Sequence, residues 1–130
     1  MSENVDVLKR GYDAFNGGDQ QTLAGVFAED VRWEGSDDER VPGAGTHEGR
    51  DAALGALGQA VEPFESLQSQ PDEFIEDGDT VVVLGHTEAR TKSGNDLKVP
   101  FVHVWRMQDA TIKRGQLLTD TSVILQALEQ

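Results

Sequence analysis

The residue best suited to carry out chemistry is His103, in the middle of the segment KVPFVHVWRM at residues 98–107. This segment alternates and is rich in β-branched and aromatic residues, a pattern that predicts a strand. Because side chains alternate along a strand, His103 shares a face with Phe101 and Trp105. An imidazole with an ordinary pKa of about 6.5 can act as a general acid or base near neutrality, or donate to a substrate oxygen. A hydrogen-bonded core histidine is the alternative.

Three other polar groups invite interpretation as metal sites. His86 and Glu88 form an H-x-E pair on one strand face, but a catalytic zinc ion requires three protein ligands, so we expect a polar surface pair. His47 and Glu48 lie in a Gly-rich loop and are expected to be solvated, although His47 can also lie at a pocket mouth. The acidic run at residues 37–39 lacks the spaced oxygen ligands of a calcium loop. No metal site is predicted.

Composition limits the classes of partner. The 130-residue chain carries 24 acidic residues against 11 Lys and Arg, and its net charge of −13 argues against nucleic acid and anionic membranes. The absence of cysteine excludes disulfides and thiol chemistry. The N-terminus lacks a secretory pattern, and no apolar run approaches the roughly 20 residues that span a membrane. We therefore expect one cytoplasmic domain over residues 1–130. Such acidity is typical of a soluble surface or, alternatively, of adaptation to high salt.

Periodicity and turn residues predict the elements that position His103. Apolar side chains three or four residues apart predict helices, and alternating segments joined at turns such as Asp77-Gly78 predict hairpins. The order is α-α-β-α-β-β-β-β-α, with helices first and an antiparallel meander afterwards, which indicates an α+β domain. The predicted elements are helices at residues 3–16, from Asp19 to Phe27 and at 50–61, a strand at 31–35, four strands between 73 and 119, and a final helix capped by Asp120 or Thr121.

Four segments resemble a known family: YDAFNGGDQQTLAGVFAEDVRWEG, the helix that begins with Gly49-Arg50, EDGDTVVV and VPFVHVWRM. They are similar to segments of the SnoaL-like and ketosteroid-isomerase-like group of the nuclear transport factor 2-like superfamily, over about residues 5–128. The resemblance implies a cone-shaped α+β barrel, in which a strongly curved, mainly antiparallel sheet wraps the N-terminal helices and encloses an apolar pocket. It also implies homodimers through the sheet. Members include isomerases, polyketide cyclases, epoxide hydrolases, dehydratases and non-catalytic modules, so the fold does not specify a reaction.

Family chemistry uses polar groups at four positions, and this chain keeps one of them. The resemblance places Gly11 at the tyrosine donor of steroid isomerases, Gly35 at their proton-shuttling aspartate, and Leu117 at the catalytic aspartate of cyclases and epoxide hydrolases. His103 falls at the second oxyanion donor of the isomerases, where some cyclases also carry a histidine. Isomerase and epoxide hydrolase chemistry need a carboxylate near the reacting group, and strand alternation turns the nearest acid, Glu34, away from the pocket.

Asp120 is the second candidate catalytic residue. It follows Thr119, so alternation points it away from the face that carries Leu117 and Thr119, and it is well placed to cap the final helix. A bulge in the turn at residues 108–110 would reverse this phase and send Asp120 into the pocket.

Several functions fit these residues. As an enzyme, the protein would bind a small apolar or aromatic molecule and isomerise, cyclise or dehydrate it through His103, with no metal or organic cofactor. As a non-catalytic module, it would hold the same ligand with His103 as the polar anchor. A dimerisation module with a filled cone is the third alternative. The residues expected to line the pocket are Tyr12, Phe15, Trp33, Gly35, Gly85, Thr87, Phe101, Trp105, Leu117 and Thr119.

Overall fold

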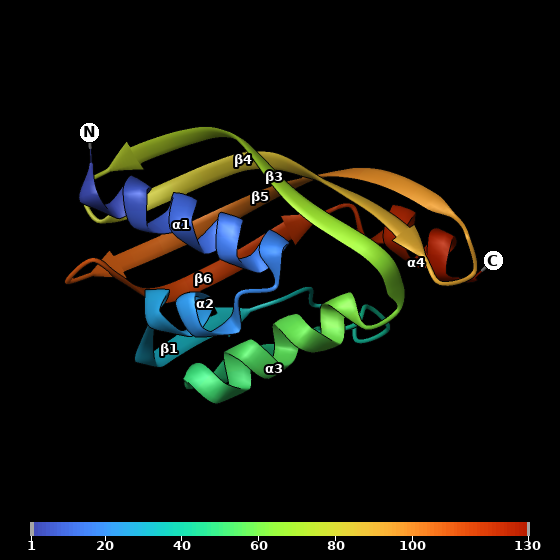
Figure 1. The fold of residues 1–130 in the computed structure, drawn as a ribbon, viewed down its shortest axis with the longest axis horizontal. Helices are drawn as coiled ribbons and strands as arrows, with labels where there is room; N and C mark the ends of the chain where they lie inside the picture. The colour runs from blue at the N-terminus through green and yellow to red at the C-terminus, as the bar shows by residue number, and fades with distance from the viewer. Residues whose placement is uncertain (1, 130) are drawn as a thin grey trace.

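Residues 2–129, the part of the chain that this computed structural model describes, form four helices and six strands. The strands make one sheet in the order β2-β1-β6-β5-β4-β3, with β1 and β6 parallel and every other neighbouring pair antiparallel. Figure 1 shows α1 lying across this sheet. The elements are α1 (Glu3–Gly17), α2 (Gln20–Val26), β1 (Phe27–Glu34), β2 (Thr46–Glu48), α3 (Arg50–Val61), β3 (Phe64–Asp77), β4 (Thr80–Thr91), β5 (Asp96–Gln108), β6 (Thr111–Thr119) and α4 (Thr121–Glu129).

The predicted α+β class is confirmed, and the order of elements differs by one added strand. The strand β2 pairs with β1 but has only three residues, Thr46–Glu48, too few for an alternating pattern to be visible in a Gly-rich stretch. The first strand also begins earlier than predicted. The sequence pattern predicts Phe27 in the second helix, but its backbone is already extended, with φ −92° and ψ 137°.

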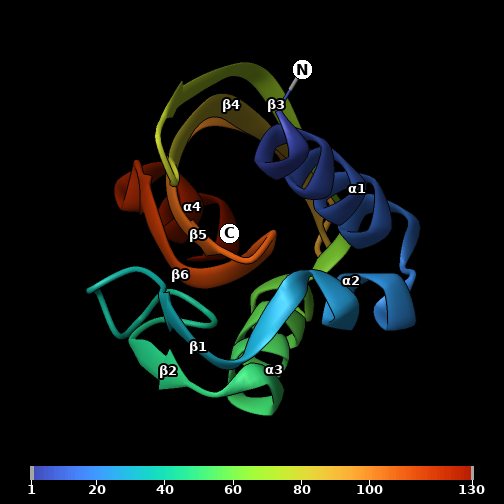
Figure 2. The ribbon, with the colours of Figure 1, turned by 90° about the vertical axis from the view of Figure 1, so that its left-hand side faces the viewer.

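The sheet curves strongly without closing on itself, as the end-on view in Figure 2 shows. The helices α1, α2 and α3 cover the open side of this curve. The side chains that face inward make the core, and those of Val31, Val81 and Val83 are fully buried there. No helix within residues 2–129 is long and apolar enough to cross a membrane. The resulting cone places one face of β5 opposite α1.

The helix α1 is positioned by caps at both ends. The side chain of Ser2 accepts from the backbone N–H of Val5 at 3.2 Å, which satisfies one of the free N–H groups at the start of the helix. Gly18 ends the helix in the left-handed conformation, with φ 72°, and its N–H returns to the carbonyls of the last turn. Between the caps, the apolar stripe that contains Leu8 and Tyr12 is buried. This stripe carries Tyr12 into the cone.

The hairpin between β5 and β6 sets the phase of the inner face. Asp109 and Ala110 have φ of 51° and 58°, as a two-residue type I′ turn requires. The pairing shifts by one residue between Arg106 and Met107, which marks a β-bulge close to the turn. Beyond the bulge, the inner-face pairs are Trp105 with Gly115, His103 with Leu117, and Phe101 with Thr119.

Candidate functional site

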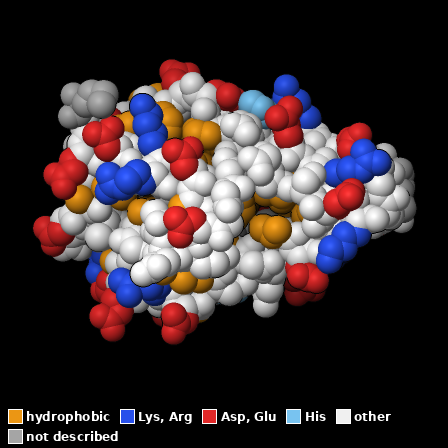
Figure 3. All heavy atoms as spheres, viewed as in Figure 1, with side chains coloured by type: hydrophobic (Ala, Val, Ile, Leu, Met, Phe, Trp, Pro, Cys, Tyr) orange, Lys and Arg blue, Asp and Glu red, His pale blue; other side chains and the backbone are white. Residues whose placement is uncertain are grey.

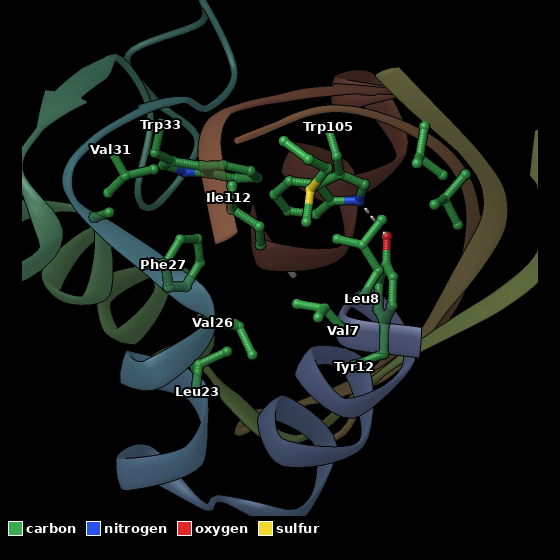
Figure 4. Packing of buried hydrophobic residues seen from close by; sticks show 14 of the residues in the cluster. Val7, Leu8, Tyr12, Leu23, Val26, Phe27, Val31, Trp33, Trp105 and Ile112 are labelled. Atoms are coloured by element: carbon green, nitrogen blue, oxygen red, sulfur yellow. Dashed lines mark hydrogen bonds between the residues drawn. The ribbon is translucent and has the colours of Figure 1, made fainter. Parts of the chain in front are cut away.

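The cone encloses a cavity of about 150 Å³. Figure 4 shows Trp33 and Trp105 from the sheet facing Val26 and Tyr12 from the helices across this interior. Figure 3 shows hydrophobic side chains in a hollow near the middle of the face that Figure 1 presents. Of the residues predicted to line a pocket or to act in it, those on the cavity wall are Tyr12, Phe15, Trp33, Gly35, Thr87, His103, Trp105, Leu117 and Thr119.

The wall of this cavity is uncharged. Among the described residues that form it, there is no Asp, Glu, Lys or Arg. The polar side chains on the wall include two titratable groups, the phenol of Tyr12 and the imidazole of His103. The other wall residues with hydroxyl groups are Ser36, Ser69, Thr87 and Thr119.

Three aromatic residues on the cavity wall form a chain of hydrogen bonds. The indole Nε1 of Trp105 donates to the hydroxyl oxygen of Tyr12 at 3.0 Å, and Figure 4 marks this bond. The same hydroxyl lies 2.6 Å from Nδ1 of His103. Tyr12 thus links two residues of β5 to α1. A strand position and a helix position 91 residues apart meet in this contact.

The imidazole of His103 is also held by its aromatic neighbours. The ring of Phe101 stacks on it, with centroids 4.1 Å apart and an interplanar angle of 25°. The ring of Trp105 lies 5.1 Å away, and that of Trp33 lies 6.1 Å away in an edge arrangement. Trp33 and Trp105 stack on each other at 5.7 Å. Contact with these three aromatic rings leaves the imidazole little freedom to rotate.

Burial controls the charge state of the site. His103 is only 8% exposed, and burial lowers its pKa to about 3, because an imidazolium would lose its hydration in these apolar surroundings. Burial likewise raises the pKa of Tyr12, and the bond from Trp105 offsets only part of this rise. The ordinary imidazole pKa of about 6.5 therefore does not apply to His103 in the folded protein. The imidazole and the phenol are both neutral at physiological pH.

Two residues predicted to line the pocket, Gly85 and Phe101, are absent from the cavity wall. A Cβ atom at Gly85 would lie 2.5 Å from Cζ of Phe101 and 2.3 Å from the carbonyl oxygen of Gln70. The space left by the glycine is therefore filled by the phenyl ring and by neighbouring backbone. Phe101 itself is buried against His103, so it supports the site from behind.

Asp120 also lies away from the cavity. Its carboxylate is exposed and accepts from the backbone N–H of Ser122 at 3.2 Å and from the Ser122 hydroxyl at 2.7 Å. These bonds lower the pKa of Asp120. A bulge does occur near the preceding turn, yet Leu117 and Thr119 still face the cavity. The structure thus places Asp120 at the start of α4 and corrects its assignment as a catalytic candidate.

We expect an Asp120→Ala substitution to lower the melting temperature by a few degrees, because the first turn of α4 loses an acceptor for its free N–H groups. Thermal unfolding followed by circular dichroism measures this change. The matched variant Asp120→Asn keeps an acceptor oxygen and should recover most of the loss. A change in ligand affinity with Asp120→Ala, at unchanged melting temperature, would contradict the capping role.

The remaining candidates lie outside the cavity, as expected. The carboxylate of Glu34 accepts from Arg114 at 2.8 Å on the outer face. His86 bonds through Nδ1 to Asp72 at 2.8 Å, and Nε2 of His47 lies 2.9 Å from the carbonyl oxygen of Ala44. Within residues 2–129, no group of three or more His, Asp or Glu side chains is arranged to hold a metal ion.

Part of the wall was not predicted. The loop after β1 contributes Ser36 and residues 41–43, and α4 contributes Ile124. The helix α3 contributes Ala56, Leu57 and Ala60, whose spacing is a recognisable helix face. The loop residues carried no comparable signal, because their position depends on packing against distant elements and not on local periodicity.

Comparisons with known proteins identify the family. The family model for the SnoaL-like domain matches residues 8–115. TerC, crystallised with polyporic acid, is 27% identical, with 99% of this chain and 100% of TerC covered and a TM-score of 0.93. An NTF2-like protein from Burkholderia pseudomallei K96243 is 29% identical, with both chains covered completely and a TM-score of 0.93. An NTF2-like protein from Burkholderia xenovorans LB400 is 28% identical, with 97% and 95% covered and a TM-score of 0.82. No curated protein is significantly similar in sequence. The chain therefore belongs to the SnoaL-like domain family, within the NTF2-like superfamily.

Proposed function

We propose that this protein binds a small, neutral aromatic molecule in the cavity, with His103 as its polar anchor. The observation that carries this proposal is an uncharged, aromatic-walled cavity with one neutral imidazole at its edge. Ligand pockets are mostly apolar with a few placed polar groups. A charged ligand would be left without a counter-ion here, and burying an unpaired charge is costly.

The size of the cavity supports a ligand of one or two rings. Apolar cavities of about 150 Å³ in proteins accept a molecule as large as benzene, and the volume here is about the same. Trp33 and Trp105 offer flat surfaces for stacking. TerC, which is 27% identical over nearly the whole chain, was crystallised with polyporic acid, and this supports a small organic ligand here.

A catalytic role is the second candidate, and the bond between Tyr12 and His103 favours it. This bond holds a neutral imidazole in a fixed orientation at 2.6 Å. A preorganised neutral imidazole can stabilise charge that develops on a substrate oxygen during isomerisation, cyclisation or dehydration. No carboxylate on the described wall can move a proton, so we rank binding before catalysis.

Binding can be tested with 1-indanone as the probe, followed by tryptophan fluorescence and thermal shift. We expect His103→Ala to weaken the binding of 1-indanone at least about tenfold, because the ligand loses the binding free energy of one buried hydrogen bond. The matched control is His86→Ala, because His86 lies on the outer face of β4 and bonds to Asp72. Equal affinities for wild type and both variants, or no binding of 1-indanone, would contradict the proposal.

We also propose that two copies pair through the outer face of the sheet. Side chains that alternate with the cavity wall point outward there, and Leu118 is 53% exposed while Ile75 is 46% exposed. Leu84, Val102 and Leu118 are neighbours across three strands, so they form a continuous apolar row. Such a row on a sheet face suits a self-complementary contact between identical copies.

Light scattering during gel filtration tests this pairing. We expect a mass of twice the 14.2 kDa of one chain for the wild type. A Leu118→Lys substitution should give the mass of one chain, because it places a charge on the most exposed residue of the apolar row. The control Thr22→Lys adds the same charge at an exposed position of α2, away from the apolar row. We expect this variant to keep twice the mass of one chain. A wild type with the mass of a single chain would exclude the pairing.

A further inference from the structure

We propose that Trp105 and Tyr12 hold His103 as the tautomer protonated on Nε2, which makes the cavity selective for ligands that offer an acceptor oxygen, such as aromatic ketones or quinones. The part about the ligand rests on the proposed function. The part about the tautomer does not, because it concerns the protein without a ligand.

The tautomer follows from counting protons along the hydrogen-bond chain. An indole N–H can only donate, so the hydroxyl oxygen of Tyr12 accepts from Trp105 at 3.0 Å. The hydroxyl carries one proton of its own. Nδ1 of His103, at 2.6 Å, is its one acceptor among residues 2–129. If Nδ1 carried a proton instead, the buried hydroxyl would accept twice and its own proton would have no partner, which is costly. Nδ1 is therefore the acceptor, and the imidazole proton lies on Nε2.

The Nε2–H group is left for a ligand. No hydrogen bond joins this nitrogen to any residue in the described range 2–129, although His103 is only 8% exposed. Within the same range, every side-chain nitrogen or oxygen that is fully buried has a hydrogen-bond partner. Nε2 has no such partner, so it is not fully buried and must border open space. The open space that His103 borders is the cavity. His103 thus presents one donor to a ligand, and the stacked ring of Phe101 helps to fix the direction of this donor.

A fixed donor discriminates between ligands of similar shape. A ketone oxygen accepts from Nε2–H, whereas a ligand that offers only an N–H group leaves two donors facing each other without a partner. Sites with a buried polar group strongly reject ligands that cannot pair with it. The matched probes are 1-indanone, which offers an acceptor, indane, which offers neither group, and indole, which offers a donor. We expect affinity to fall at least about tenfold from 1-indanone to indole.

Nitrogen NMR of the imidazole rings tests the tautomer directly in the wild-type protein. Uniform ¹⁵N labelling and long-range proton–nitrogen correlations distinguish a protonated ring nitrogen from an unprotonated one. We expect an unprotonated Nδ1 and a protonated Nε2 for His103 at pH 7. The half-buried His47 and His86 on other elements serve as internal references. A protonated Nδ1 in His103, or a mixture of both tautomers, would overturn the proposal.

The variants separate the two parts of the proposal. In Tyr12→Phe, Nδ1 loses its donor, so we expect mixed tautomers and a smaller preference for 1-indanone over indole. Trp105→Phe keeps the Tyr12 hydroxyl but frees it to rotate, and we expect a weaker shift in the same direction. If wild-type His103 carries Nε2–H but no ketone binds, the proposed function and the ligand part fail together. If ketones bind to a Nδ1–H form, the proposed function stands and this inference fails.

Discussion

Between pH 7 and pH 5, the free energy of unfolding of the wild type should fall by about 2 kcal/mol more than that of a His103→Gln variant. The pKa of His103 is about 3 in the folded protein, against about 6.5 in the unfolded chain. Between these two values the unfolded chain binds a proton that the folded protein does not. Stability is therefore fully present above pH 6.5 and is lost as the pH falls towards 3. Glutamine is neutral throughout this range and can still accept from Tyr12.

Chemical denaturation at several pH values, followed by circular dichroism, measures this difference. The surface carboxylates with a lowered pKa, such as Asp38 at about 2, affect wild type and variant alike, so they cancel in the comparison. His86→Gln is the matched control. Its imidazole is on the outer face and bonds to Asp72, so this variant removes an imidazole without changing the cavity. Parallel curves for wild type and His103→Gln would show that the imidazole is protonated at pH 5 without unfolding.

The face of β5 that enters the cone could be predicted because alternation is a local rule. Phe101, His103 and Trp105 are all buried, as the period of two requires. The partner of His103 could not be predicted in the same way. Tyr12 was expected on the pocket wall, but its bond to an imidazole 91 residues away depends on how α1 is placed across the sheet. No sequence pattern within either segment indicates where α1 lies relative to the sheet.

The charge state of the site could not be predicted for the same reason. The expected pKa near neutrality describes an imidazole in water, whereas the lowered value results from burial by rings that come from α1, β1 and β5. The shape of the cavity is also a property of the assembled cone. Gly35 and Gly85 are both predicted to line the pocket, yet of the two only Gly35 lies on the cavity wall. Phe101 occupies the space beside Gly85.

Gly115 on β6 lies directly against the side chains of the two tryptophans. It pairs with Trp105 across β5 and β6 and with Trp33 across β1 and β6. A Cβ atom there would lie 2.4 Å from Cζ3 of Trp105 and 2.9 Å from Cε3 of Trp33. Both distances are far inside van der Waals contact. Gly115 has no positive φ, so glycine is needed here for the two indole rings and not for an unusual backbone conformation.

A Gly115→Ala substitution should therefore lower the free energy of unfolding by about 2–3 kcal/mol, the cost of overpacking a well-packed core. Gly55→Ala is the matched control, because a Cβ at this exposed position in α3 meets nothing within 4 Å. We expect that variant to be more stable than the wild type by about 0.5–1 kcal/mol, the helix propensity of alanine over glycine. Denaturant titration measures both values. If Gly115→Ala is as stable as the wild type, the indoles move into the cavity at no cost, and the same variant should then bind 1-indanone more weakly.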